Sequence, residues 1–114
     1  MKLKDIVSKI DAKVVCGENW EDSEIEYAFA SDLMSDVLTV HCEKLLLITG
    51  LCNLQTIRTA EMSDIQHIVL VRNKKASQDM VELAEENDIV IIECPHSMYR
   101  AVGELYQTGL KPVF

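Results

Sequence analysis

Three short apolar runs of the chain begin at intervals of 22 residues, and each is followed by a segment with helical periodicity. The runs are Leu45–Thr49, His67–Val71 and Ile89–Glu93. Buried strands that alternate with helices are typical of βα units, in which a right-handed crossover joins parallel strands. The pattern therefore predicts an α/β domain with a largely parallel sheet flanked by helices in three layers. In such a sheet a ligand site lies at the carboxyl ends of the strands.

The composition indicates a single domain that does not attract polyanions. The 114 residues include 48% hydrophobic side chains, enough for one core, so we expect one domain over residues 1–114. Nineteen acidic against eleven basic side chains give a net charge of −8, which disfavours binding to nucleic acid. No apolar stretch approaches the roughly 20 residues that cross a bilayer, and residues 1–10 are charged rather than signal-like. We therefore expect a cytoplasmic protein with no membrane or nucleic acid partner.

Four cysteines are spread along the chain without the close spacing of a zinc motif. They are Cys16, Cys42, Cys52 and Cys94. Without a signal peptide disulfides are not expected, and free cysteines are commonly small buried side chains. We therefore predict no metal and no cofactor. The alternative is a metal site assembled from Cys94, His96 and the pair His41–Cys42.

The first thirty residues predict one helix and two strands. Apolar residues recur at helical spacing within residues 3–10. Residues 12–16 form an apolar run that ends at Gly17, and Trp20 lies in the acidic loop that follows. Within residues 24–30 large apolar side chains alternate with smaller or polar ones, which is the period of a half-buried strand.

Ser31 and Asp32 lie between this strand and the segment from Leu33 to His41, which predicts a further helix. A side-chain oxygen at this position commonly caps the first turn of a helix, and this is the interpretation we favour. The alternative is that both residues face a ligand, because a strand end followed by a helix also offers free backbone N–H groups.

Each repeat supplies polar residues where its helix should begin. The expected starts are Asn53 or Gln55, Ser77 and Ser97, and Gly109 should end the last helix. The side chains expected to face the sheet in the first of these helices are Leu54, Ile57 and Met62. The third helix is expected to run through Ala101, Val102, Leu105 and Tyr106 to Gly109.

Four stretches of the chain resemble those of stand-alone DRTGG-domain proteins. They are residues 30–37 (ASDLMSDV), 46–50 (LLITG), 81–86 (VELAEE) and 102–110 (VGELYQTGL). The resemblance extends over nearly the whole chain. It implies a fold similar to the amino-terminal domain of HPr kinase/phosphorylase. It also implies an accessory role, because this family is found beside CBS pairs and phosphotransacetylase or P-loop domains.

The chain departs from this family at the stretch that gives the family its name. In the register set by residues 30–32, the Asp, Arg, Thr, Gly and Gly of the pattern fall on Asp22, Ser23, Glu26, Tyr27 and Ala28. Only the Asp is kept. Because glycine permits close backbone approach and arginine contacts anions, these replacements argue against phosphate binding at this stretch.

The ends of the predicted strands should bring polar side chains together at one edge of the sheet. The candidate ligand-binding residues are Ser31, Asp32, Thr49, Gly50, Arg72, Asn73, Lys74, His96 and Ser97. Thr49-Gly50 is a weak anion-loop signal, and a strand-ending turn also explains it. Residues 72–74 form a small basic cluster that suits a phosphate or a carboxylate; a solvated turn is the alternative.

The tetrapeptide Cys94-Pro95-His96-Ser97 combines a thiol and an imidazole at a helix amino terminus. Such a thiol can have a lowered pKa, and the imidazole could act as its base. One alternative function is therefore a hydrolase or transferase that uses Cys94, His96 and Asp32. His67, at the start of a strand, is expected to be a structural histidine with its hydrogen bonds satisfied.

These features together favour a non-catalytic regulatory domain. It would bind a small metabolite or nucleotide-like ligand at the strand ends and report the ligand to a protein partner or across a homodimer. A purely structural assembly subunit is the remaining alternative. The candidate contacts for a dimer or an assembly are Tyr27, Phe29, Val113 and Phe114.

Overall fold

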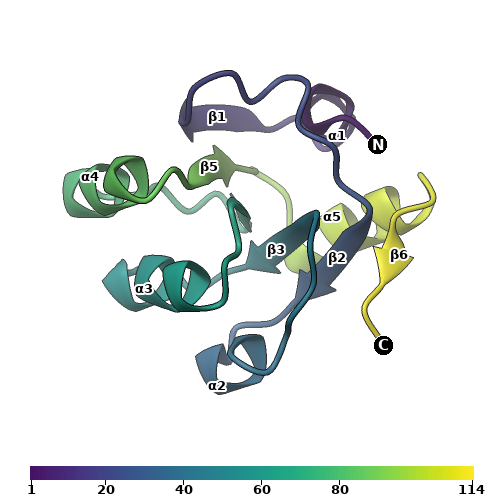
Figure 1. The fold of residues 1–114 in the computed structure, drawn as a ribbon. Helices are drawn as coiled ribbons and strands as arrows, with labels where there is room; N and C mark the ends of the chain where they lie inside the picture. Colours follow the sequence, from purple (N-terminus) through teal and green to yellow (C-terminus); the bar gives the residue numbers. More distant parts are fainter.

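The computed structural model describes all residues from Met1 to Phe114, and they form one six-stranded sheet with helices on both faces (Figure 1). The helices are α1 (Leu3–Lys9), α2 (Met34–Val37), α3 (Leu54–Met62), α4 (Gln78–Glu86) and α5 (Met98–Tyr106). The strands are β1 (Lys13–Cys16), β2 (Tyr27–Ala30), β3 (Leu45–Thr49), β4 (His67–Leu70), β5 (Val90–Glu93) and β6 (Lys111–Pro112). None of the helices combines the length and the apolar character that crossing a membrane requires.

The strands follow the order β1-β5-β4-β3-β2-β6. β2 to β5 are parallel neighbours, and β6 adds two residues parallel to β2. β1 pairs with β5 in the antiparallel direction. The largely parallel α/β sheet that the repeat predicts is therefore confirmed, and the antiparallel strand lies outside the repeat.

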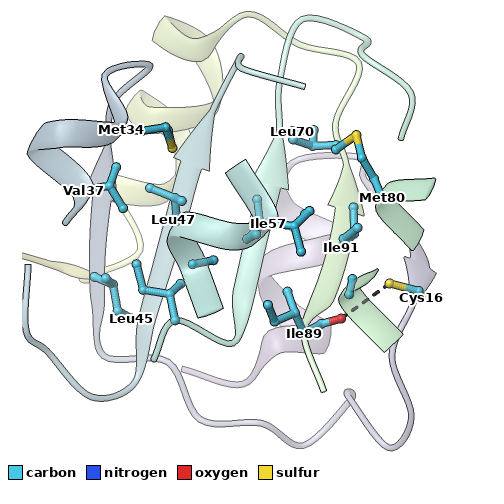
Figure 2. Packing of buried hydrophobic residues seen from close by; sticks show 14 of the residues in the cluster. Cys16, Met34, Val37, Leu45, Leu47, Ile57, Leu70, Met80, Ile89 and Ile91 are labelled. Carbon is cyan, nitrogen blue, oxygen red and sulfur yellow. Dashed lines mark hydrogen bonds between the residues drawn. The ribbon is translucent and has the colours of Figure 1, made fainter. Parts of the chain in front are cut away.

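The sheet is covered on both faces, so each of the strands β1 to β5 contributes to two cores. Alternate residues of β3 separate to the two sides: Leu45 and Leu47 pack toward α2, α3 and α4, whereas Leu46 and Ile48 pack toward α1 and α5. Figure 2 shows the first of these cores, with Ile57 of α3 lying over the sheet. Burying one such Leu or Ile stabilises the fold by about 1.5–3 kcal/mol, which explains the continuous apolar runs.

The helix starts that the sequence predicts are confirmed. Asn53, Ser77 and Ser97 are the N-caps of α3, α4 and α5, and each side chain accepts a hydrogen bond from a backbone N–H three residues later. Gly109 follows α5 with a φ of +98°, a conformation that L-residues rarely adopt. The polar residue at the start of each of these helices therefore has a capping role.

One inward-facing prediction is wrong, because Met62 is 70% exposed. The buried side of α3 includes Ile57 and Ala60, and Met62 lies two residues beyond Ala60, about 200° around the helix. Leu105 occupies the buried position at the end of α5, so Tyr106 is turned toward the surface.

The segment from β2 to β3 is less regular than predicted. The strand expected over residues 24–30 is confined to Tyr27–Ala30, and the helix expected from Leu33 to His41 is confined to α2. Beyond α2 the backbone N–H groups of Thr39 and Val40 bond three residues back, which tightens the helix into turns. The Thr39 hydroxyl also donates to the Asp36 carbonyl oxygen at 2.7 Å and so competes with a regular helix.

Candidate ligand-binding site

The carboxyl ends of β2, β3, β4 and β5 lie side by side, because these strands are parallel neighbours in the sheet. The last residues of these strands and the loops that follow them carry all nine candidate residues. Polar side chains that are distant in sequence are therefore collected along one edge, as the repeat predicts. The hydrogen bonds along this edge decide which of these side chains remain free to bind a ligand.

Asp32 fastens the loop after β2 to the loop after β3. Its Oδ1 accepts hydrogen bonds from the backbone N–H of Gly50 at 2.6 Å and from the Thr49 hydroxyl at 3.1 Å. The Thr49 oxygen in turn accepts from the backbone N–H of Leu51 at 3.1 Å. The buried Thr49 hydroxyl is therefore fully used, and Asp32 joins two strand ends.

The prediction that Ser31 and Asp32 cap the following helix is wrong. The N-cap of α2 is Leu33, which makes no side-chain capping bond. The Ser31 oxygen accepts from the backbone N–H of Leu33 at 3.0 Å and so forms a local turn. Asp32 instead accepts the backbone N–H of Gly50, at the end of the neighbouring strand β3.

Arg72 and Asn73 form a turn that is anchored to the loop after β5. Both residues have a left-handed φ, 61° and 58°, which is uncommon for side chains of this size. The backbone N–H of Arg72 donates to the His96 carbonyl oxygen at 2.7 Å, and that of Asn73 donates to the Cys94 carbonyl oxygen at 3.0 Å. These two bonds hold the turn in place despite its strained backbone.

The guanidinium of Arg72 lies directly over Gly50. A Cβ added to Gly50 would be 3.0 Å from Nε of Arg72 and 3.1 Å from one of its terminal nitrogens. The absence of a side chain at Gly50 therefore makes room for the arginine. Arg72 takes part in none of the ion pairs of the protein, so its charge is available.

Glu93 is a second acidic residue at this edge, and the sequence analysis did not identify it. Its side chain is only 10% exposed. Its Oε2 accepts from the backbone N–H of Ala76 at 2.8 Å, and its Oε1 lies 3.6 Å from Nζ of Lys75. A carboxylate at the end of an otherwise apolar strand was the available signal. Glu93 fastens the loop before α4 to the end of β5.

Cys94 and His96 are turned away from this edge. Cys94 is buried, its thiol donates to the Ile10 carbonyl oxygen at 3.4 Å, and burial raises the pKa of that thiol. Nε2 of His96 lies 2.9 Å from Oδ2 of Asp11, on the loop after α1. A thiol with a raised pKa and an imidazole held elsewhere do not form a nucleophile and its base, so both observations argue against the enzyme alternative.

Of the remaining candidates, Ser97 is hydrogen-bonded within the protein, whereas the side chains of Asn73 and Lys74 are not. The Ser97 oxygen accepts from the backbone N–H of Arg100 at 3.1 Å and is used as a cap. Asn73 and Lys74 are exposed beside Arg72, and Lys74 extends the basic surface. No three His, Cys, Asp or Glu side chains gather where they could hold a metal ion, so the Cys94, His96 and His41–Cys42 site is not formed. All four cysteines are free thiols.

The sequence model of the DRTGG domain covers most of this fold, with a match over residues 5–108. The chain belongs to the DRTGG domain family. The resemblance noted from four sequence stretches is therefore confirmed, and no curated protein sequence matches the chain.

The fold of this DRTGG domain is similar to a solved structure. That structure holds the CBS and DRTGG domains of the regulatory region of Clostridium perfringens pyrophosphatase, complexed with the activator diadenosine tetraphosphate. The TM-score is 0.70 and the identity 16%, and the match covers 94% of this chain and 46% of that chain. This DRTGG domain thus spans less than half the length of its structural relative.

The stretch that aligns with the family signature lies at the opposite edge of the sheet. Asp22 precedes β2, and its Oδ1 lies 3.2 Å from Nζ of Lys2 and 3.8 Å from Nζ of Lys4. The other aligned residues lead into or begin β2 at its amino-terminal end. In this DRTGG domain the signature stretch and the basic carboxyl edge are therefore separate places.

Proposed function

We propose that this DRTGG domain is a non-catalytic regulatory module that binds a small phosphate-bearing, nucleotide-like ligand at the carboxyl ends of its parallel strands. The main support for this proposal is the Arg72 guanidinium, which lies over Gly50 and makes no ion pair with an acidic side chain. The related pyrophosphatase region, complexed with a dinucleotide activator, gives a precedent for ligand-dependent regulation in a protein with a DRTGG domain. Binding would be reported to a partner protein or across a dimer.

The hydrogen bonds of the acidic groups leave Arg72 without an ion pair at this edge, in a protein of net charge −8. Asp32 and Glu93 each accept a backbone N–H, and Glu93 also lies 3.6 Å from Nζ of Lys75, so neither carboxylate is bound to Arg72. Arg72 is left to form charge-assisted, bidentate bonds with a phosphate. Lys74 adds a second positive charge within the same turn.

A thermal-shift titration with diadenosine tetraphosphate, ATP, ADP and inorganic phosphate tests this proposal. At a hundredfold excess over the dissociation constant, a ligand adds about 2.7 kcal/mol to the free energy of unfolding. Arg72→Ala should remove a saturable shift, whereas Arg58→Ala, an exposed arginine on α3, should retain it. No shift with any compound, or equal shifts in both variants, would contradict the proposal.

We also propose that the domain acts as a homodimer. The exposed ring of Phe114 packs against Phe29 in an edge-to-face contact with centroids 6.1 Å apart, and Tyr27 and Val113 extend the same apolar surface. Covering this surface would favour association. A monomer at micromolar concentration in sedimentation velocity would contradict the dimer.

We propose that the protein acts in the cytoplasm, because its four cysteines are free thiols and such thiols are typical of a reducing compartment.

A further inference from the structure

Helix α5 carries a second apolar face in addition to the side that packs on the sheet. This face, which we call the α5 stripe, consists of residues at spacings of three, four and seven: Tyr99, Val102, Gly103 and Tyr106. Because successive residues of a helix are rotated by about 100°, these four lie within one stripe about 100° wide. Tyr99 is 91% exposed and Tyr106 is 68% exposed. The α5 stripe therefore has the width of a face that helices normally bury, but it is turned to the surface.

An apolar groove of about 130 Å³ lies beside the α5 stripe, between α5 and the neighbouring strands β2 and β6 (Figure 1). Val102 and Tyr106 belong to both the stripe and the groove. On β2 the groove is lined by the small side chains of Ala28 and Ala30, which leave the space open. An apolar cavity of about 150 Å³ can hold one benzene ring. The groove therefore has room for one aromatic ring.

The aromatic side chains nearest to this groove in the same chain do not fill it. Tyr27 and Phe29 alternate with the alanines of β2, so they pack on the opposite face of the sheet, toward α2. The ring of Phe114 packs against Phe29 on that opposite face. Tyr99 is two helical turns, about 10 Å, from Tyr106 at the groove. A ring that fills the groove therefore has to come from another molecule.

Gly103 lies in the middle of the α5 stripe. A Cβ added to this residue would meet no atom within 4 Å, so no contact within the protein requires a glycine here. Glycine in the interior of a helix is destabilising relative to alanine. What its missing side chain permits is the close approach of a second backbone. The centre of the stripe is therefore shaped for contact with another helix.

The α5 stripe carries no charge. The two charged residues of α5, Arg100 and Glu104, lie on another side of the helix and form an ion pair with each other at 3.0 Å. Two copies of a protein of net charge −8 can therefore meet at this stripe without placing like charges in contact.

We propose that two copies of this domain pair through antiparallel α5 stripes, with the Tyr99 ring of each copy inserted into the groove of the other. A twofold axis between Val102 and Gly103 places Tyr99 of one helix opposite Tyr106 of the other, at the mouth of the groove. One surface then supplies both the ring and the space for it, as a twofold interface requires. Lys111 at the groove makes no ion pair, so its ammonium group is available to the tyrosine hydroxyl.

Sedimentation velocity at a series of protein concentrations tests this pairing. Tyr99→Ser should raise the dissociation constant of the pair about tenfold or more, because a buried tyrosine is a typical hot spot of an interface. Met62→Ser removes another exposed apolar side chain, from α3 on the opposite face of the sheet, and should leave the dissociation constant unchanged. Phe114→Ser removes the exposed ring of the surface proposed above for a homodimer. It should leave a dimer that the further change Tyr99→Ser disrupts, because the two surfaces lie on opposite faces of the sheet.

Gly103→Gln separates pairing from folding. Glutamine is a better helix former than glycine, and there is open space around this position, so the melting temperature of the dilute monomer should not fall. The new side chain would nevertheless hold two α5 helices apart and raise the dissociation constant about tenfold or more. The proposal is overturned if the wild type stays monomeric at every concentration or if Tyr99→Ser and Gly103→Gln pair as the wild type does. It is also overturned if Phe114→Ser alone abolishes pairing, a result that would leave the dimer on the surface around Phe29.

Discussion

The two edges of the sheet differ in how their acidic groups are used. At the carboxyl edge Asp32 and Glu93 accept backbone N–H groups and join neighbouring loops, so Arg72 is left without a partner. At the amino edge Asp64 is free and His67 is buried and neutral. An acidic protein can therefore leave an arginine without an ion pair where its nearby carboxylates bind its own backbone.

The largest expected effect concerns the packing of the amino edge at Gly17. Gly17→Ala should cost about 3 kcal/mol, because its φ of +126° disfavours any side chain and the new Cβ would lie 2.7 Å from Cγ2 of Val90. Gly109→Ala, with a φ of +98° and open space around it, should cost about 1 kcal/mol. Urea unfolding measures both, and equal losses would show that backbone strain alone governs the site.

The next effect tests whether the carboxylates of the carboxyl edge hold its loops. Glu93→Ala should cost about 2 kcal/mol and Asp32→Ala about 1 kcal/mol, because each leaves a backbone N–H without its partner and Glu93 is the more buried. Glu86→Ala, at an exposed position on α4, is the control and should be nearly neutral. If all three variants unfolded at the same urea concentration, the loops would not depend on these carboxylates.

A smaller effect depends on pH and concerns His67. Because the folded pKa lies below 6.5, the stability that the neutral ring contributes is fully present above pH 6.5 and is lost as the pH falls through the folded pKa. His67→Phe should flatten the pH dependence of unfolding in this acid range by at most about 1.4 kcal/mol per pH unit. His41→Phe, at an exposed position, should keep the wild-type slope. If the free energy of unfolding changed with pH equally in both variants, His67 would not be the source of the acid sensitivity.

The repeat made the central fold predictable, but some contacts could not be read from it. β3 to β5 and the caps of their helices depend on residues that are close in sequence, so local patterns identify them. The bond from Asp32 to Gly50 spans 18 residues and depends on which strands are neighbours. The antiparallel β1 follows from no local pattern, because a strand of four residues does not encode its direction.

The candidate site could likewise be predicted from local sequence only in part. The repeat predicts that these loops lie at one end of the sheet, and residues 72–74 do form an exposed turn there. The sequence could not tell that Asp32 and Ser97 are occupied by backbone N–H groups, or that Arg72 lies over Gly50. The burial of His67, which is 9% exposed, likewise depends on tertiary contacts that no local pattern encodes.

An amide NMR titration of the protein with diadenosine tetraphosphate tests most directly which end of the sheet binds the ligand. Binding at the carboxyl edge predicts that the signals of Gly50, Arg72 and Asn73 move first and saturate together. Amides at the amino edge, such as those of Asp64 and His67, should stay in place. Signals that move only at that edge, or no movement at all, would contradict the assignment of the ligand site to Arg72.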